Sequence, residues 1–215
     1  MGLREINEKR TRELIEEAAR ELFCLRGIGG TDLKEIAEAV GIPRTTLYTY
    51  YRDKDALSSA VYLRNLKSML AHLDVKKLQK RRQACKGDLG SVINLTLDDL
   101  IANFVKDPDA YIYDFAYNLH AAQGHRNPGD LEGYPTEAAP GLAAFRQVLE
   151  DAIAAGQMKR CASPLDFLQL VTFPLVAYIV RLAVFERQKS KPDFAGAGRT
   201  VQAFKTLLLQ AAFGG

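Results

Sequence analysis

The sequence predicts an all-α fold of about nine helices with no β-sheet. Nearly every segment repeats its apolar residues with the period of a helix, and no segment alternates apolar and polar residues as a half-buried strand does. Of the 215 residues, 47% are hydrophobic and 26% are charged, which is the balance of a globular chain. Glycines and prolines mark the breaks between helices. We expect a small N-terminal three-helix domain at residues 1–53 and a larger helical domain at residues 54–215.

Residues 18–57 have the pattern of a helix-turn-helix, in which two short helices cross steeply over a small core. Asp32, followed three residues later by a glutamate, has the spacing of a capping box and starts a helix from Leu33 to Val40. Gly41 suits the left-handed backbone that ends a helix, and Pro43 suits the first turn of the next one. The expected core consists of Leu22, Phe23, Ile36, Ala37, Val40, Ile42, Leu47 and Tyr51.

The helix that begins at Pro43 has a polar face, which we expect to contact DNA. If Leu47 points inward, helical spacing turns Arg44, Thr45 and Tyr48 outward together. Arginine pairs with guanine edges in the major groove, and threonine offers a hydroxyl and a methyl group to thymine. The alternative is a small three-helix domain whose polar surface has no binding role. Helix propensity alone would favour alanine, glutamate or lysine on such a surface. The expected DNA contacts are Lys34, Arg44, Thr45, Thr46, Tyr48, Thr49, Tyr50 and Lys54.

Charge alone does not predict DNA binding. The net charge is +3, and residues 1–54 hold equal numbers of basic and acidic side chains. DNA binding therefore has to rest on the local geometry of the short helix. Basic residues dominate from Arg64 to Lys86, a stretch that we interpret as a solvated helix end and linker.

Residues 18–60 resemble the DNA-binding domain of the tetracycline-repressor (TetR) family. The matching positions are Ala19, Leu22, Phe23, Gly27, Ile36, Ala37, Gly41, Ile42, Thr46, Leu47, Tyr48, Tyr50, Tyr51, Lys54 and Leu57. The resemblance implies a homodimer that binds palindromic double-stranded operator DNA, usually as a repressor released by a small-molecule effector. Two departures concern the docking on DNA: Pro43 stands where members often have serine or threonine, and Thr45 stands where glycine is common.

The remaining helices are expected at Lys54–Leu73, Ser91–Lys106, Pro108–Ala122, Gly141–Ala155, Pro164–Phe185 and Thr200–Phe213, with the longest loop from Gly124 to Pro140. The resemblance implies that the middle helices form an effector pocket and that the last two form the homodimer interface. The helix Pro164–Phe185 is apolar nearly all round, as burial on two sides would require. Packing within one chain alone is the alternative.

Aromatic residues of the Pro108–Ala122 helix are the candidate ligand contacts. Tyr113, Tyr117 and His120 fall on one helical face, and Phe104 and Phe145 could join them from neighbouring helices. A pocket with an apolar lining and a few polar groups is typical of small-molecule sites. Ordinary core packing is the alternative for each residue.

The sequence gives no sign of catalysis, since it has no cofactor-binding loop and no activated nucleophile, so we expect neither an enzyme nor a cofactor. His120 and His125, with Asp114 and Asp130, share no single helical face, and we expect no metal site.

Three widely spaced cysteines fit a reducing cytoplasm, and the N-terminus is too charged for a signal peptide. Gln169, Pro174 and Arg181 argue against a membrane span at 167–185. A helical ligand-binding or scaffold module that has lost DNA affinity is the alternative function.

Overall fold

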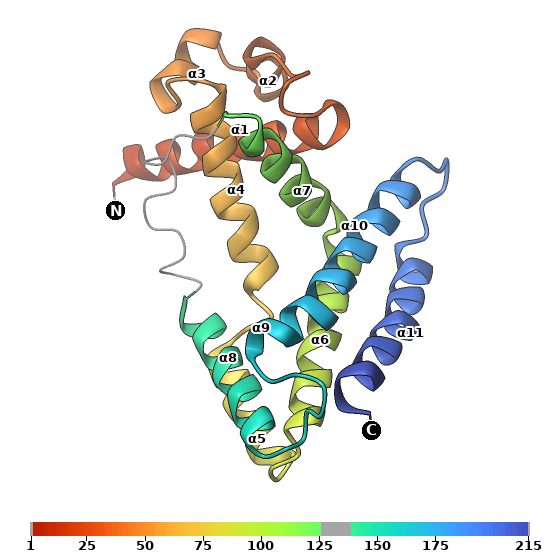
Figure 1. Ribbon diagram of the computed structural model, residues 1–215. Coiled ribbons are helices and arrows are strands. Elements are labelled where there is room, and N and C mark those ends of the chain that lie inside the picture. Colours follow the sequence, from red (N-terminus) through yellow and green to blue (C-terminus); the bar gives the residue numbers. More distant parts are fainter. Residues whose placement is uncertain (1, 126–138, 215) are drawn as a thin grey trace. The chain divides into compact units, whose positions relative to one another are not determined.

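The computed structural model describes residues 2–125 and 139–214, which are helical and contain no strand (Figure 1), so the expected all-α class is confirmed. The chain forms two compact units. One takes in Met1–Leu66 and Ile112–Tyr134, and the other Lys67–Tyr111 and Pro135–Gly215. The boundary expected at residue 53 divides the DNA-binding part from the ligand-binding part, and it does not coincide with the division into compact units. This functional boundary stays a prediction.

The first unit is built on α1 (Leu3–Arg26), α2 (Leu33–Val40), α3 (Arg44–Tyr50) and most of α4 (Lys54–Leu70) and α7 (Pro108–Ala122). Two tyrosines of α7 take part in its core: the Tyr113 hydroxyl donates to the Ser58 carbonyl oxygen at 2.8 Å, and the hydroxyls of Tyr117 and Ser59 lie 3.1 Å apart. The apolar core consists of Ile15, Ala19, Phe23, Ile28, Leu33, Ile36, Ala37, Leu47, Tyr51, Leu57, Val61, Tyr62, Tyr113 and Tyr117.

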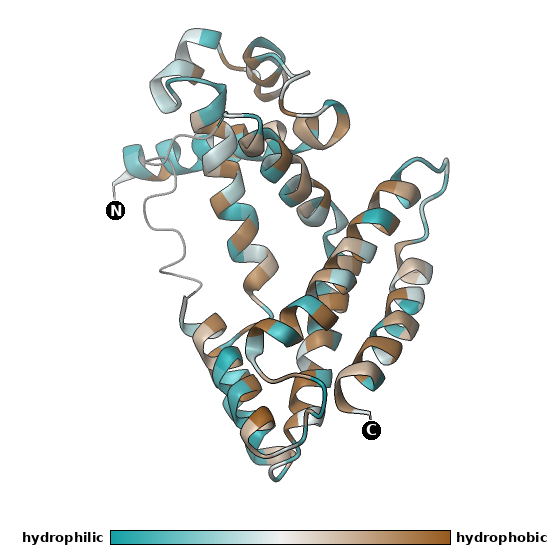
Figure 2. Ribbon diagram, in the orientation of Figure 1, coloured by the Kyte–Doolittle hydropathy of each residue, from teal (hydrophilic) through white to brown (hydrophobic). Residues whose placement is uncertain are grey.

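The second unit contains the other helices. These are α5 (Val75–Ala84), α6 (Leu89–Lys106), α8 (Ala139–Ala154), α9 (Pro164–Phe167), the π-helical turn η2 (Leu168–Thr172), α10 (Phe173–Arg187) and α11 (Phe194–Phe213). The helix α11 packs against both α6 and α10. Figure 2 shows hydrophobic residues along α10 and α11.

A π-helical turn lies within the helix expected at Pro164–Phe185, which runs on to Arg187. Pro174 has no N–H, so the Leu170 carbonyl oxygen cannot receive the usual i→i−4 hydrogen bond from it. The chain widens just before this proline, and the Phe173 N–H bonds to the Leu168 carbonyl oxygen five residues back. The insertion of one wider turn therefore keeps the helix continuous through the proline.

Two helices differ from the sequence predictions. The linker expected between Arg64 and Lys86 contains α5, whose basic sequence gives little apolar periodicity because only Leu78 is buried. The last helix begins at Phe194 rather than Thr200. Its first turn has the glycines that lower helix propensity, but the Asp193 side chain caps it by accepting a hydrogen bond from the Gly196 N–H at 2.7 Å.

One helix in the described part of the chain, Pro164–Arg187, is long and apolar enough to span a membrane by length and composition, with a mean hydropathy of 1.9. Interface and core helices of soluble proteins meet the same criterion. The loop expected between Gly124 and Pro140 falls largely on residues 126–138, outside the described residues.

Candidate nucleic-acid interface and ligand cavity

The helix α2 is fixed at both ends by the predicted residues. The Asp32 side chain accepts a hydrogen bond from the Lys34 N–H at 2.7 Å, and the Glu35 side chain accepts one from the Asp32 N–H at 3.1 Å. That backbone hydrogen bond, together with Arg26, lowers the pKa of Glu35. Gly41 adopts the left-handed conformation, with φ 76° and ψ 32°. The capping box and the glycine terminator are therefore confirmed.

The short helix α3 is oriented by its buried residues. Leu47 is completely buried and Tyr51 nearly so, whereas Arg44, Thr45, Tyr48 and Thr49 are exposed. Pro43 is the N-cap, with φ −59°, and gives no side-chain hydrogen bond to the helix. One face of α3 is thus anchored in the core, and the opposite face presents the polar side chains that the sequence places there.

Arg44 and Tyr48 form a pair on the exposed face of α3. The Arg44 guanidinium donates to the Tyr48 hydroxyl at 3.0 Å and lies over the tyrosine ring, 5.5 Å from its centroid. This hydrogen bond raises the pKa of Arg44. Among the described residues no carboxylate forms an ion pair with Arg44. A charged guanidinium on an exposed helix is suited to pair with base edges or phosphates.

The flanking candidates occupy more constrained positions. Lys34 forms an i,i+4 ion pair with Glu38 at 3.6 Å on exposed α2. The Lys54 ammonium donates to the carbonyl oxygens of Gly29 and Thr31, both at 3.1 Å, and so holds the turn that precedes α2. Thr46 and Tyr50 are half-buried.

The end of α3 rests on a polar arrangement that the sequence analysis missed. The guanidinium of Arg12 lies 5.6 Å from the ring centroid of Tyr50 and 5.5 Å from that of Tyr51. The Tyr51 hydroxyl donates to the Glu16 carboxylate at 2.7 Å, and burial is the main cause that raises the pKa of Tyr51. Exposed Arg12 therefore adds a cation beside the C-terminal end of α3. It comes from α1, and no local sequence signal links it to α3.

An apolar cavity of about 160 Å³ lies within the second unit. It is lined by Met69, Leu70, His72, Leu73, Thr96, Leu97, Leu100, Tyr111, Leu142, Phe145, Leu168, Thr172 and Val176. Burial lowers the pKa of His72, and its Nδ1 lies 2.7 Å from the Met69 carbonyl oxygen, so the neutral ring donates through Nδ1. The Thr172 hydroxyl is buried and has no hydrogen-bond partner among the described residues. Among the described residues, no lysine or arginine lines the cavity.

The five candidate ligand residues do not come together. Phe145 lines the cavity, whereas Phe104 packs edge-on against Tyr111 and Phe194. Tyr113 and Tyr117 belong to the core of the first unit. His120, also in that unit, contacts Asp55.

The short helices α2 and α3, with the exposed polar face of α3, have the arrangement of a helix-turn-helix DNA-binding domain. The sequence model of the family described as "Bacterial regulatory proteins, tetR family" matches residues 15–61. Residues 15–61 are therefore a TetR-type DNA-binding domain, which confirms the resemblance seen in the sequence.

Solved structures of TetR-family regulators share the whole fold. A TetR family transcription regulator from Marinobacter aquaeolei is 17% identical, with a TM-score of 0.69 over 97% of this chain and 98% of its own. PfmR from Thermus thermophilus is 16% identical, with a TM-score of 0.66 over 92% and 97%. The fatty acid degradation regulator FadR from Bacillus halodurans is 16% identical, with a TM-score of 0.59 over 92% and 94%. The chain thus has the fold of a TetR-family transcription regulator.

Proposed function

We propose that the chain is a homodimeric repressor that binds a palindromic operator through α3 and leaves it when a small molecule binds the second unit. The observation that carries the proposal is the face of α3 opposite the buried Leu47, where Arg44, Thr45, Tyr48 and Thr49 are exposed. Helices of this kind enter the major groove and read base edges with a few side chains. We assign DNA binding to residues 1–53, and ligand binding and dimerisation to residues 54–215.

Within the interface, we assign base readout to the exposed face of α3 and phosphate contacts to its flanks. Arg44 and Tyr48 lie one helical turn apart and already contact each other, so they would enter the groove as a unit. Thr46, Tyr50, Lys34 and Lys54 would hold phosphates and fix the register. Arg12 joins this group because its guanidinium lies over the Tyr50 ring.

The test is binding of the chain to the DNA upstream of its own gene, followed by fluorescence anisotropy. We expect Tyr48→Ala to weaken binding by about tenfold or more, because it removes a groove-facing ring and the partner of Arg44. Phe115→Ala is the matched control, since Phe115 is an exposed aromatic residue of the same unit outside the interface. Equal affinity of Tyr48→Ala and the unmodified chain would refute the assignment of the groove face. A chain that binds none of this DNA would favour the scaffold alternative.

The homodimer interface is assigned to α10 and α11. Phe173 (57% exposed), Phe185 (54%) and Leu207 (62%) project from these helices with their apolar surface uncovered in the single chain. Burial of the exposed part of these side chains against a second copy would stabilise a dimer through the hydrophobic effect. A two-fold dimer of this kind would place two copies of α3 on successive turns of a palindromic site.

The effector is assigned as an uncharged, mostly apolar molecule. The cavity offers apolar side chains, a neutral His72 whose Nε2 can accept a hydrogen bond, and the unpartnered Thr172 hydroxyl. With no cationic residue among the described residues of the lining, an ionised carboxylate would be buried unpaired at a high cost.

We further infer that the chain acts by binding, not by catalysis, and that it works in the cytoplasm. The structural relatives described above are transcription regulators. No disulfide joins the cysteines of the described residues, as a reducing compartment favours.

A further inference from the structure

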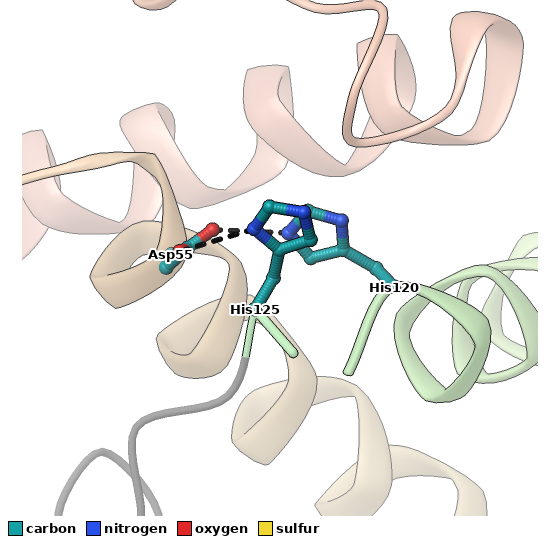
Figure 3. Close-up of side chains that lie close together, drawn as sticks. All are labelled: Asp55, His120 and His125. Atoms are coloured by element: carbon teal, nitrogen blue, oxygen red, sulfur yellow. Dashed lines mark hydrogen bonds and ion pairs between the residues drawn. The ribbon is translucent and has the colours of Figure 1, made fainter. Parts of the chain in front are cut away.

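Three potential metal ligands converge within the first unit, between the first turn of α4 and the end of α7. Figure 3 shows Asp55, His120 and His125 with their polar atoms turned toward one another. One donor atom from each side chain lies within 4.8 Å of the other two. The His120 Nε2 is 2.9 Å from one Asp55 oxygen, and the His125 Nδ1 is 3.8 Å from the other.

Burial and packing hold two of these ligands in place. The His120 side chain is only 8% exposed and that of Asp55 29%, whereas that of His125 is 52% exposed. The two imidazole rings are stacked, with centroids 4.3 Å apart and planes 6° apart. A buried ligand, a half-buried carboxylate and an exposed third ligand make a site that is preformed on one side and open to solvent on the other.

We propose that Asp55, His120 and His125 bind a divalent first-row transition metal ion such as Zn²⁺. Two imidazoles and a carboxylate are common ligands of Zn²⁺, at distances of about 2.0–2.2 Å. Tetrahedral ligand atoms then lie about 3.4 Å apart. His125 is the side chain that has to move closer, and its exposure leaves it free to rotate. Three protein ligands leave the fourth position to water.

Metal binding at these residues would clamp α4 to the segment that ends α7. Asp55 follows Lys54 at the start of α4, four residues after the buried Tyr51 that anchors α3. A metal ion would therefore join the base of the recognition motif to residues 65 and 70 positions further along the chain. The His120–Asp55 hydrogen bond already makes part of this connection. The ion would replace the proton on Nε2 of His120.

The test is Zn²⁺ titration of the untagged full chain by calorimetry, with Co²⁺ absorption as a second readout. We expect one ion per chain and a Co²⁺ spectrum without a thiolate charge-transfer band, which separates this site from the three cysteines. His125→Gln should lower Zn²⁺ affinity by at least about tenfold, because it removes a ligand while its exposed position spares the core. His120→Gln should do the same, with circular dichroism to verify its folding.

His72→Gln is the matched control, since His72 is the third histidine of the chain and lies in the other unit. It should bind Zn²⁺ as the unmodified chain does. A His125→Gln chain that keeps full affinity, or an unmodified chain that binds no Zn²⁺, overturns the proposal. Neither readout involves DNA, so failure here is separate from failure of the operator-binding proposal.

Discussion

Single residues in and next to α3 divide between buried anchors and exposed polar side chains. Leu47 and Tyr51 are buried, and one helical turn of exposed side chains faces away from them. Because α3 has only seven residues, its orientation depends on these two anchors rather than on its own stability. The chemistry of each exposed residue can therefore be tested with little risk to the fold.

Arg44→Lys tests whether the guanidinium reads bases or binds phosphate. A bidentate pair with guanine needs the planar fork, so lysine should lower operator affinity by about 1–3 kcal/mol. The slope of affinity against salt should stay unchanged, because the charge is kept. Anisotropy titrations over a range of salt concentrations measure both. An Arg44→Lys chain with full affinity, beside an Arg44→Ala chain with a smaller salt slope, would identify a phosphate contact instead.

Tyr51→Phe tests the polar anchor of α3. It removes the hydrogen bond to Glu16 and should lower the free energy of unfolding at pH 7 by about 1.5–3 kcal/mol. The pKa of Tyr51 is raised in the folded state, so its contribution is complete below about pH 10 and is lost as pH rises from there.

Urea unfolding at pH 7 and above pH 10 measures both effects. Tyr51→Phe should lose less stability between these conditions than the unmodified chain does. Tyr113, whose pKa is also raised by burial, should keep part of the alkaline loss in the variant. An identical alkaline loss in both chains would contradict the role given to Tyr51.

Among the elements, α2 was predicted closely because its signals are local. A capping residue and a terminating glycine fall at the ends of an apolar repeat, and each acts through its own turn. The helix α5 was missed because its sequence is mostly polar and basic and only Leu78 is buried. The π-helical turn next to Pro174 also has no apolar signature, since it depends on a hydrogen bond that the proline cannot make.

Asp32→Ala tests the capping box of α2. Loss of the side-chain acceptor for the Lys34 N–H should lower the free energy of unfolding by about 1 kcal/mol, measured by urea denaturation. Asp32→Asn is the control, because asparagine caps a helix about as well as aspartate does. If both variants lost the same stability, the charge of Asp32 rather than its hydrogen bond would be responsible.

Thr172→Val tests the cavity at the π-helical turn. The Thr172 hydroxyl is buried without a partner in the described chain, so a methyl group of similar size should leave stability unchanged or raise it slightly. If the hydroxyl binds the effector, the variant should stay on operator DNA at effector concentrations that release the unmodified chain. Equal release of both chains would show that the effector is held elsewhere.

The ligand sites show where sequence reasoning stops. Of the five aromatic and histidine candidates, Phe145 alone lines the described cavity, because helical spacing places residues on a face but does not say which unit that face packs against. Asp55 was not considered with His120, since 65 positions separate them. Only the packing of α7 against α4 brings the two side chains together.

For the whole molecule, Leu207→Glu tests the assigned homodimer interface. A charge at this exposed apolar position of α11 should convert the dimer into a monomer, as measured by light scattering after size exclusion. Operator affinity should fall with it, because two linked half-sites bind far more tightly than one. Leu25→Glu is the control, an equally exposed leucine on α1 that should leave the dimer intact. A dimeric Leu207→Glu chain would place the interface elsewhere.

The charge balance of residues 1–54 affects how such a regulator distributes between its operator and non-specific chromosomal DNA. Binding to random DNA depends on phosphates neutralised by cations, and here basic and acidic side chains are equal in number. We expect the chain to be held weakly by the vast excess of unrelated sequence. Fewer protein molecules are then bound at those competing sites, so a small number of molecules per cell can keep one operator occupied.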